Sequence, residues 1–375
     1  MRLVRLAFAI GALWVVAAAL GQPYVRGEVL VKFRPGATRS SLSLHRLGAR
    51  VVQRLHGIGV ECVRISSGTS VERAVALLRS DPGVLYAEPN FIVRLHDVDD
   101  PLYSRQWNLR KIMAPAAWTI STGSPSVLVA VLDTGADLGH PDLAGQIAAS
   151  RNFVGFGPAT DAIGHGTHDA GTVAAKTDDL LAIASLGYQT RLLIGKVVAD
   201  NGQGDLATIA QGVLWAADRG ARVITMSLGV NVFSQTLKDA VDSAWSRGIV
   251  LVASAGNNNN SVPVYPAAYD HCIAVAATDE KDRRCIFSNY GNWVHVAAPG
   301  QSILGLFKNG GTATLSGTSM AAPHVAALAA LMWANGARSN QSIRTAIENS
   351  GDPAFGFGLY PVGRINARRA LLRLP

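Results

Sequence analysis

Three polar side chains that lie far apart in the sequence have the types needed for nucleophilic catalysis. Asp133 ends a buried apolar run, His165 lies between two glycines at a predicted helix start, and Ser319 opens a helix of small residues. A serine hydroxyl becomes an effective nucleophile when an imidazole accepts its proton, and the imidazole needs an acid to fix its tautomer. The chain order Asp, His, Ser is one of three known for this machinery.

Each of these residues also has an ordinary structural interpretation. Alone, Asp133 is typical of a helix-capping acid, His165 of a satisfied structural histidine, and Ser319 of an N-cap serine. The combination favours catalysis because all three lie where strands end and helices begin. A fourth residue supports it: Asn257 follows another apolar strand, and its side-chain N–H is suited to join the backbone N–H of Ser319 in binding an oxyanion.

Three other functions fit part of this pattern. A catalytically inactive, peptide-binding scaffold would keep the fold without turnover. An esterase of the α/β-hydrolase kind needs an acid and then a histidine after its nucleophile, but only His324 follows Ser319, with no acid between them. A zinc hydrolase would use His165 and His168, but the helix lacks the glutamate of a zinc-protease motif and the chain offers no third ligand.

The elements that must position these residues form an alternating series after residue 100. Apolar runs typical of buried parallel strands alternate with helical patterns around 165–176, 205–220 and 234–247, and a further helix follows Ser319. We predict an α/β fold with a doubly wound, mostly parallel sheet and helices on both faces. In such a sheet the functional residues lie at the carboxyl ends of the strands.

The N-terminal quarter has a different character. Residues 1–21 have a charged start, a 15-residue apolar run and a small-x-small cleavage site, which predicts a secretory signal peptide rather than an uncleaved anchor. Residues 22–96 predict a small α+β domain and 97–375 the main domain. The segment HDVDDP at 96–101, where the two meet, predicts an exposed acidic linker. We therefore expect a secreted protein, extracellular or periplasmic, without a stable membrane anchor.

Charge and cysteine content narrow the partners. The net charge of +8 comes from the first 96 residues, whereas residues 97–375 carry 21 basic and 21 acidic side chains, so we expect no nucleic-acid partner. Cys272 and Cys285 bracket a polar loop and are compatible either with a disulfide or with two buried thiols, and Cys62 lies apart from both.

The motifs DTGAD, GHGTH, SLG, ASAGN and SGTSMAAPHVA occur in the order found in subtilisin-like serine proteases, the subtilase family, and the chain most resembles the thermitase branch. The resemblance covers nearly all of residues 100–370. Residues 27–96 resemble the inhibitory propeptide of the family, with GEVLVKF and VLYAEPNF as its marks. It implies a ferredoxin-like propeptide that assists folding, inhibits the enzyme and is cut off autocatalytically between about 93 and 100.

The resemblance also implies residue roles. Ser319 would be the nucleophile, His165 the general base and acid, Asp133 the orienting acid and Asn257 the oxyanion donor. Protein or peptide substrates would pair as a β-strand with two edges of a cleft, formed by Ser227, Leu228 and Gly229 and by Gly202 and Gly204. We expect a monomeric endopeptidase that works through an acyl-enzyme.

A structural Ca²⁺ is a further implication of the resemblance. Asp100, Asp142 and Asp179 match the places where the family holds it, and carboxylate oxygens suit this ion. The chain departs from the family pattern in the loop that follows, where Ala182 and Ser185 replace glycines. The same three acids are also compatible with solvated surface positions.

Two more departures lie near the catalytic motifs. Asp169 stands four residues after His165, where the family has an apolar or small residue, and a buried carboxyl there would raise the pKa of the base or titrate itself. Val230 replaces a smaller residue after SLG, and we expect it to narrow the cleft.

Overall fold

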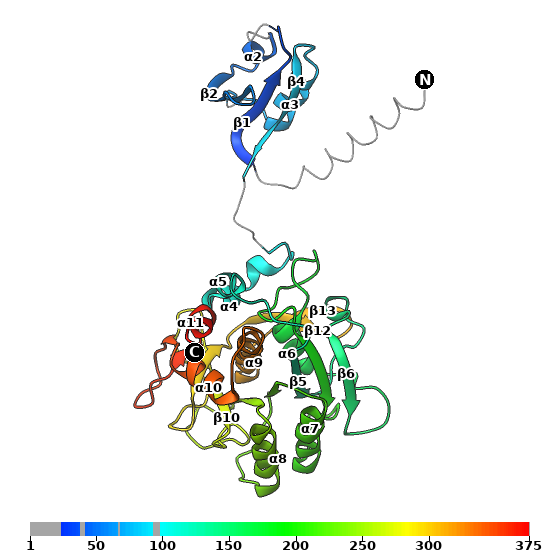
Figure 1. The fold of residues 1–375 in the computed structure, drawn as a ribbon, viewed down its shortest axis with the longest axis vertical. Coiled ribbons are helices and arrows are strands. Elements are labelled where there is room, and N and C mark those ends of the chain that lie inside the picture. Colours follow the sequence, from blue (N-terminus) through cyan, green and yellow to red (C-terminus); the bar gives the residue numbers. More distant parts are fainter. Residues whose placement is uncertain (1–23, 38–41, 67, 93–97, 375) are drawn as a thin grey trace. The chain divides into compact units, whose positions relative to one another are not determined.

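The structure is a computed structural model, and it describes four stretches of the chain: 24–37, 42–66, 68–92 and 98–374. Contacts divide the chain into two compact units at residues 97 and 98 (Figure 1). The predicted signal peptide lies outside the described residues. Within the described stretches, every helix is too short or too polar to cross a membrane.

The first unit is an antiparallel sheet of four strands in the order β2-β3-β1-β4, with two helices. Its elements in chain order are β1 (Tyr24–Phe33), α2 (Leu42–Arg46), β2 (Arg50–Leu55), β3 (Val60–Arg64), α3 (Val71–Arg79) and β4 (Val84–Phe91). This βαββαβ succession is the expected ferredoxin-like arrangement. Ser70 caps α3 through a bond from the Arg73 amide, and the helix buries Ala74 and Leu78.

The second unit is built around a sheet of nine strands in the order β14-β15-β11-β10-β9-β8-β5-β7-β6. All neighbouring pairs in it are parallel except the edge pair β14 and β15. These strands are β5 (Leu128–Asp133), β6 (Ile147–Asn152), β7 (Arg191–Lys196), β8 (Val223–Met226), β9 (Val250–Ser254), β10 (Cys272–Thr278), β11 (Val296–Pro299), β14 (Asp352–Pro353) and β15 (Gly363–Arg364). A separate hairpin consists of β12 (Ile303–Phe307) and β13 (Gly311–Leu315).

Helices cover both faces of this sheet (Figure 1). The longer helices are α6 (His165–Ala174), α7 (Leu206–Asp218), α8 (Gln235–Ser246), α9 (Thr318–Ala334) and α10 (Asn340–Glu348). The shorter ones are η1 (Tyr103–Arg105), α4 (Trp107–Lys111), α5 (Ala114–Trp118), η2 (Pro141–Leu143) and α11 (Ala367–Leu372). The fold is therefore the doubly wound α/β architecture that the alternating apolar runs predict.

The two faces of β5 show why the layers form. Val129 and Val131 belong to a core with α6 and α9, whereas Ala130 and Leu132 belong to a second core with α7 and α8. Successive side chains of a strand point to opposite faces, so an uninterrupted apolar strand needs a helical layer on each side. In the sheet, β5 lies between β8 on one side and β7 on the other, so later strands are added on both sides of it. The point where the strand order reverses therefore lies at the carboxyl end of β5.

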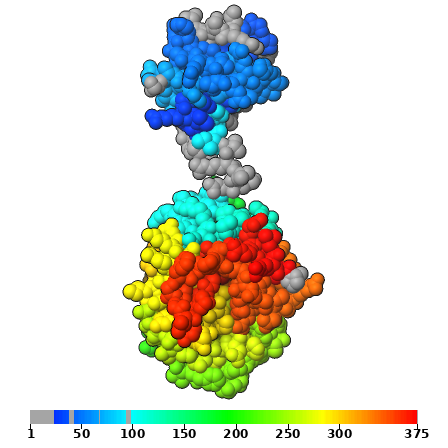
Figure 2. Space-filling view, turned by 90° about the vertical axis from the view of Figure 1, so that its left-hand side faces the viewer, coloured from blue at the N-terminus to red at the C-terminus, as the bar shows by residue number. Residues whose placement is uncertain are grey.

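The beginning and end of the second unit lie together. The amide of Ala367 in α11 donates to the carbonyl of Ile112 at 2.8 Å, and Figure 2 shows the red C-terminal segment beside the cyan segment after residue 100. The predicted exposed linker is wrong at its C-terminal end, because Asp100 is only 4% exposed and Val98 packs against the core. The physical reason is the loop at 178–180, whose backbone amides donate to Asp99 and Asp100, a pairing that composition alone does not reveal.

Candidate active site

Asp133 and His165 are in direct contact. Asp133 is the last residue of β5 and His165 the first of α6, and Nδ1 of the ring lies 2.7 Å from Oδ1 of the acid. The Asp133 side chain is 3% exposed and the ring 29%. The Asp133 carboxylate raises the pKa of His165 above its usual value, and burial of the ring opposes this. The contact fixes the tautomer with the proton on Nδ1 and leaves Nε2 as the basic nitrogen.

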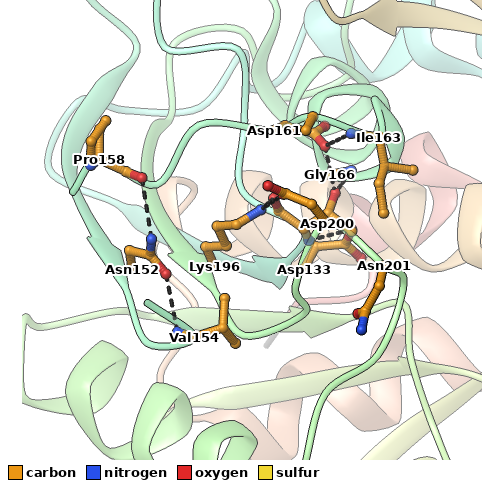
Figure 3. A network of polar contacts seen from close by, with 12 residues as sticks. Asp133, Asn152, Val154, Pro158, Asp161, Ile163, Gly166, Lys196, Asp200 and Asn201 are labelled. Atoms are coloured by element: carbon orange, nitrogen blue, oxygen red, sulfur yellow. Dashed lines mark hydrogen bonds and ion pairs between the residues drawn. The ribbon is translucent and has the colours of Figure 1, made fainter. Parts of the chain in front are cut away.

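A polar network fixes the end of β5 (Figure 3). The Thr134 amide donates to Asp133 Oδ1 at 2.7 Å, and the Thr134 hydroxyl accepts from the Gly166 amide at 2.9 Å. The buried Lys196 ammonium donates to the Thr134 carbonyl at 2.7 Å. The strand that carries the acid and the helix that carries the imidazole are thus joined by hydrogen bonds independent of the Asp133–His165 contact.

Asp161 completes this network, although no motif singled it out. Its carboxylate accepts from the amides of Ile163, Gly164 and Thr167 at 2.8 to 2.9 Å and from the hydroxyls of Thr134 and Thr167. These amides are the free donors at the start of α6, which an acid satisfies well. The available signal was an acid just before a predicted helix start.

Glycines around His165 permit the close approach of strand and helix. A Cβ on Gly166 would lie 2.1 Å from the Gly135 carbonyl oxygen and 3.1 Å from Asp133 Oδ1. Gly164 has φ +100°, and a Cβ there would lie 2.3 Å from the ring of Phe307. A larger residue at Gly166 would push α6 away from β5 and break the Asp133–His165 contact, whereas one at Gly164 would collide with Phe307 of β12.

Ser319 is the second residue of α9 and lies beside the end of β8. Its hydroxyl makes a long bond of 3.4 Å to the Ser227 carbonyl, and the Ser227 hydroxyl donates to the Ser319 carbonyl at 3.0 Å. Among the described residues, the Ser319 hydroxyl is bonded to Ser227 and not to His165. Catalytic hydrogen bonds in structures without substrate are often loose and tighten only in the reacting complex.

Asn257 and Ser319 present two N–H groups to the same small space. The Thr318 amide and hydroxyl donate to Asn257 Oδ1 at 2.9 and 3.0 Å, which turns Nδ2 away from Thr318. A Cβ on Gly317 would lie 3.5 Å from Asn257 Nδ2 and 3.6 Å from the Ser319 amide nitrogen. The glycine therefore leaves open a position from which both donors are within reach.

A cleft of about 960 Å³ runs past Asp133 and His165. Its walls include all five residues predicted to bind substrate, which are Gly202, Gly204, Ser227, Leu228 and Gly229. Val230 also lines it and is 37% exposed, and its backbone pairs with Tyr265 through two bonds of 2.8 and 2.9 Å. Because this pairing fixes the backbone of Val230, its branched side chain takes up space at the cleft that a smaller residue would leave free.

Asp169 lies inside the protein beside the Asp133–His165 pair. It is fully buried, and neither carboxyl oxygen has a hydrogen-bond partner among the described residues. One of its oxygens lies within 4.8 Å of an oxygen of Asp133 and of a ring nitrogen of His165. Burial raises the pKa of Asp169 well above its usual value. Burial therefore favours the protonated form of this carboxyl, which lies next to the imidazole.

The structure does not bring His165 and His168 into one metal site. His168 is fully buried, its Nε2 lies 3.0 Å from the Ile303 carbonyl oxygen, and burial lowers its pKa to about 4. The cysteine alternative is also decided, because Cys272 and Cys285 are both free and buried. Burial raises the pKa of each thiol to about 12, which makes them unreactive.

The predicted calcium ligands are partly brought together. Asp100 and Asp142 are 4% and 0% exposed, and each has one buried carboxyl oxygen without a hydrogen-bond partner. Burial raises the pKa of Asp100 to about 7 and of Asp142 to about 6. The carboxyl oxygens that lie within 4.8 Å of one another belong to Asp99, Asp100 and Asp178, and both Asp142 and Asp179 are outside that group. Two buried oxygens without donors suit a hard cation.

The family follows from comparison with known proteins. Residues 124–359 match the model of the subtilase family. The chain is a subtilase. Residues 14–90 of this subtilase match the fervidolysin N-terminal prodomain, so the protein also has a prodomain. The expected family, its fold and the propeptide resemblance are thereby confirmed.

Relatives of this subtilase agree with that assignment. It is 41% identical over 355 residues to the thermophilic serine proteinase of Bacillus sp. (strain AK1), covering 93% of this chain and 88% of that protein. It is 45% identical over 276 residues to thermitase of Thermoactinomyces vulgaris, covering 73% of this chain and 98% of thermitase. A solved protease from Pseudoalteromonas arctica PAMC 21717 superimposes with a TM-score of 0.68 at 29% identity, covering 75% of this chain and all of that one.

The subtilase is accordingly a serine-type endopeptidase and a zymogen with a prodomain. The esterase and zinc-hydrolase interpretations are wrong, since neither belongs to this family. The inactive scaffold is likewise set aside, because the relatives are serine proteinases and the Asp133–His165 contact is intact.

Proposed function

We propose that the protein is a secreted serine endopeptidase that forms an acyl-enzyme at Ser319. His165 takes the Ser319 proton and returns it to the leaving amine, and Asp133 orients the imidazole and stabilises the imidazolium. The observation that carries this proposal is the 2.7 Å contact between Asp133 and His165 beside the cleft. A deacylating water then repeats the sequence, with His165 again as base.

The oxyanion of each tetrahedral intermediate would be bound by Asn257 Nδ2 and the Ser319 amide. Support comes from the space beside Gly317, which both nitrogens face, and from the position of Ser319 at the start of α9. The positive end of a helix dipole and free N–H groups are strongest at that position. Donors held in advance act on the developing charge without reorganising.

Substrate would enter the cleft as an extended strand. The backbone of Ser227, Leu228 and Gly229 follows a sheet strand and retains groups for pairing, and Gly202 and Gly204 form the opposite edge. Protein and peptide chains of varied sequence fit this mode, because main-chain bonds supply most of the recognition. Val230 and Tyr265 would restrict bulky side chains at one end.

The prodomain would be removed by the enzyme itself. Asp99 accepts from the Leu180 amide and Asp100 from the Asp178 amide, so these two acids belong with the catalytic unit. A cut before residue 98 retains them, within the expected range of about 93 to 100. We further propose that residues 1–21 direct export, that the prodomain inhibits until it is cut, and that the mature enzyme is monomeric.

Ca²⁺ fits the buried acids as a structural ion. Asp100 and Asp142 would hold the ion, and Asp99, Asp178 or Asp179 would supply further negative charge. Burial favours protonated carboxyls at Asp100 and Asp142, and the bound ion would displace those protons. The ion supplies stability to the loop at 178–180 and takes no part in the reaction.

The test is the Ser319→Ala variant of the full chain. We expect it to accumulate as an unprocessed precursor without activity on casein, whereas wild type matures and digests casein. Mass spectrometry of both products locates the cut. A variant that matures and digests casein at the wild-type rate would refute the assignment of Ser319.

A further inference from the structure

Asp169 is a buried acid beside His165 that the proposed reaction does not use. It lies on α6 one turn after His165, and its carboxyl reaches the same small region as the Asp133–His165 contact. The other buried acid nearby, Asp161, has five hydrogen-bond donors, whereas Asp169 has none among the described residues. A buried carboxyl without donors is costly and calls for an explanation other than packing.

The neighbours of Asp169 on the catalytic side favour opposite states of its carboxyl. Asp133 at the end of β5 and Asp161 before α6 repel a negative charge there, whereas a protonated His165 attracts one. A hydrogen bond from the hydroxyl of Ser227, after β8, would stabilise the charge, but the Ser227 proton is donated to the Ser319 carbonyl. The charge of Asp169 is therefore coupled mainly to the charge of His165.

The other elements packed against α6 add little charge. The strand β12 has no titratable side chain, and α9 contributes His324, whose pKa burial lowers to about 4. Lys196 of β7 donates its ammonium protons to Thr134 and Asp200. Asp142 of η2 lies by the far end of α6, where its carbonyl accepts from the Lys176 amide.

We propose that Asp169 is a positioning residue for the base: its carboxyl is a second acidic partner of His165, and it moves the onset of proteolysis to higher pH by favouring the protonated imidazole. This inference rests on the proposed role of His165. Over an intermediate pH range the two groups hold one proton between them. When the proton is on the carboxyl, the ring is neutral and the base is ready.

When the ring takes that proton, Asp169 becomes a carboxylate and the base is blocked. The total charge is the same in both forms, because one proton moves from one group to the other. An opposite charge within about 4–6 Å shifts a titration by roughly one to three pH units. Removing the carboxyl therefore removes the blocked form and makes the base available at lower pH.

The first experiment compares kcat/KM from pH 5 to pH 10 for wild type, Asp169→Asn and Asp169→Val. We expect the acid limb of both variants to fall by about one pH unit relative to wild type. Asp218→Asn, which removes an exposed acid paired with Arg247, is the matched control and should leave the limb unchanged. If the acid limbs of the kcat/KM profiles of wild type and Asp169→Asn coincide, the proposal is overturned. The proposal is also overturned if the acid limb shifts in Asp169→Val but not in Asp169→Asn, because that result indicates an effect of packing and not of charge.

The second experiment is independent of turnover. The His165 ring is titrated by NMR in the full chain carrying Ser319→Ala, with and without Asp169→Asn. We expect the midpoint to be lower with Asp169→Asn than without it, and equal midpoints would overturn the inference. Failure of the proposed function would show differently, as full proteolysis by Ser319→Ala, while the ring titration would still report the coupling.

Discussion

The side-chain oxygen of Asn257 accepts two hydrogen bonds from Thr318, at 2.9 and 3.0 Å, and this fixes which end of the amide faces Ser319. The donor end is held in place before any substrate binds. Asn257→Ala should therefore lower kcat by about 10²–10³ with little change in KM, because the lost bond forms only with the oxyanion. Asn349→Ala, an exposed asparagine after α10, serves as the control. A variant of Asn257 with raised KM and unchanged kcat would contradict this role.

Gly317 gives a steric test of the same space. Its backbone is extended, with φ 165° and ψ 162°, so alanine fits the backbone without strain. The added methyl group would lie between Asn257 Nδ2 and the Ser319 amide nitrogen. We expect Gly317→Ala to fold normally and to lose roughly tenfold or more in kcat, since one displaced donor costs up to about 10³. Normal kcat in a folded Gly317→Ala protein would place the oxyanion elsewhere.

The last residue of β5 and a residue just after this strand are two acids that form a matched pair for mutation. Asp133 contacts the imidazole, whereas Asp137 accepts from the backbone amides of Gly139 and Gly310. Asp133→Asn should reduce kcat by about 10⁴, because an amide no longer fixes the productive tautomer. Asp137→Asn should stay within about twofold of wild type. Similar losses in both variants, measured on a peptide substrate, would indicate a general effect of charge on the fold.

The His165–Asp133 contact also predicts the pH dependence of the wild-type enzyme. The carboxylate raises the pKa of His165, and the base works only when the ring is neutral. Activity should therefore appear as pH rises, with the acid limb above the ordinary histidine value of about 6.5. A limb in kcat/KM well below pH 6 would be inconsistent with this environment for the base.

Calcium dependence should follow the protonation of the buried acids. The folded-state pKa values of Asp100 and Asp142, about 7 and about 6, exceed the ordinary value of 3.8. Without a cation, stability should therefore be lost as pH rises from about 4 to 7, because only the unfolded chain ionises freely. With Ca²⁺ at a hundredfold excess over its Kd, the gain at pH 8 is about 2.7 kcal/mol, or roughly 5–10 °C in Tm.

This calcium experiment measures Tm of the full chain with Ser319→Ala, with Ca²⁺ or with a chelator, at pH 5 and at pH 8. Asp142→Asn is the matched variant, since it removes one buried carboxyl that lacks a donor. The increase in Tm on adding Ca²⁺ should be larger at pH 8 than at pH 5, and smaller in Asp142→Asn than in the chain that retains Asp142. If Ca²⁺ raises Tm equally at both pH values and in both chains, the ion does not bind at Asp100 and Asp142.

Much of the catalytic unit follows from local patterns in the chain. The apolar strands and their following helices are predictable because buried parallel strands need continuous apolar runs, and the helix starts at His165 and Ser319 are marked by glycine and small residues. The strand β6 cannot be predicted from a continuous apolar run, because its burial varies irregularly at the sheet edge, and the same holds for β2, whose valines Val51 and Val52 are exposed.

The surroundings of individual acids did not follow from the chain. Asp100 was expected in an exposed linker and is buried, since only the folded chain brings the loop at 178–180 beside it. Asp161 acquires its five donors in the same way. For Asp169 the sequence identified the residue, whereas its burial without donors depends on Ser227 and Asp133, which are distant in the sequence. Electrostatic environment is a tertiary property, and residue spacing does not encode it.

The central claim is that Ser319 is a nucleophile activated by His165. A fluorophosphonate probe reports this directly, because it forms a bond to an activated serine Oγ with loss of fluoride. Peptide mass spectrometry should find one label per mature chain, on Ser319, and none in His165→Ala. Full hydrolysis of casein by protein whose Ser319 remains unlabelled would contradict the account.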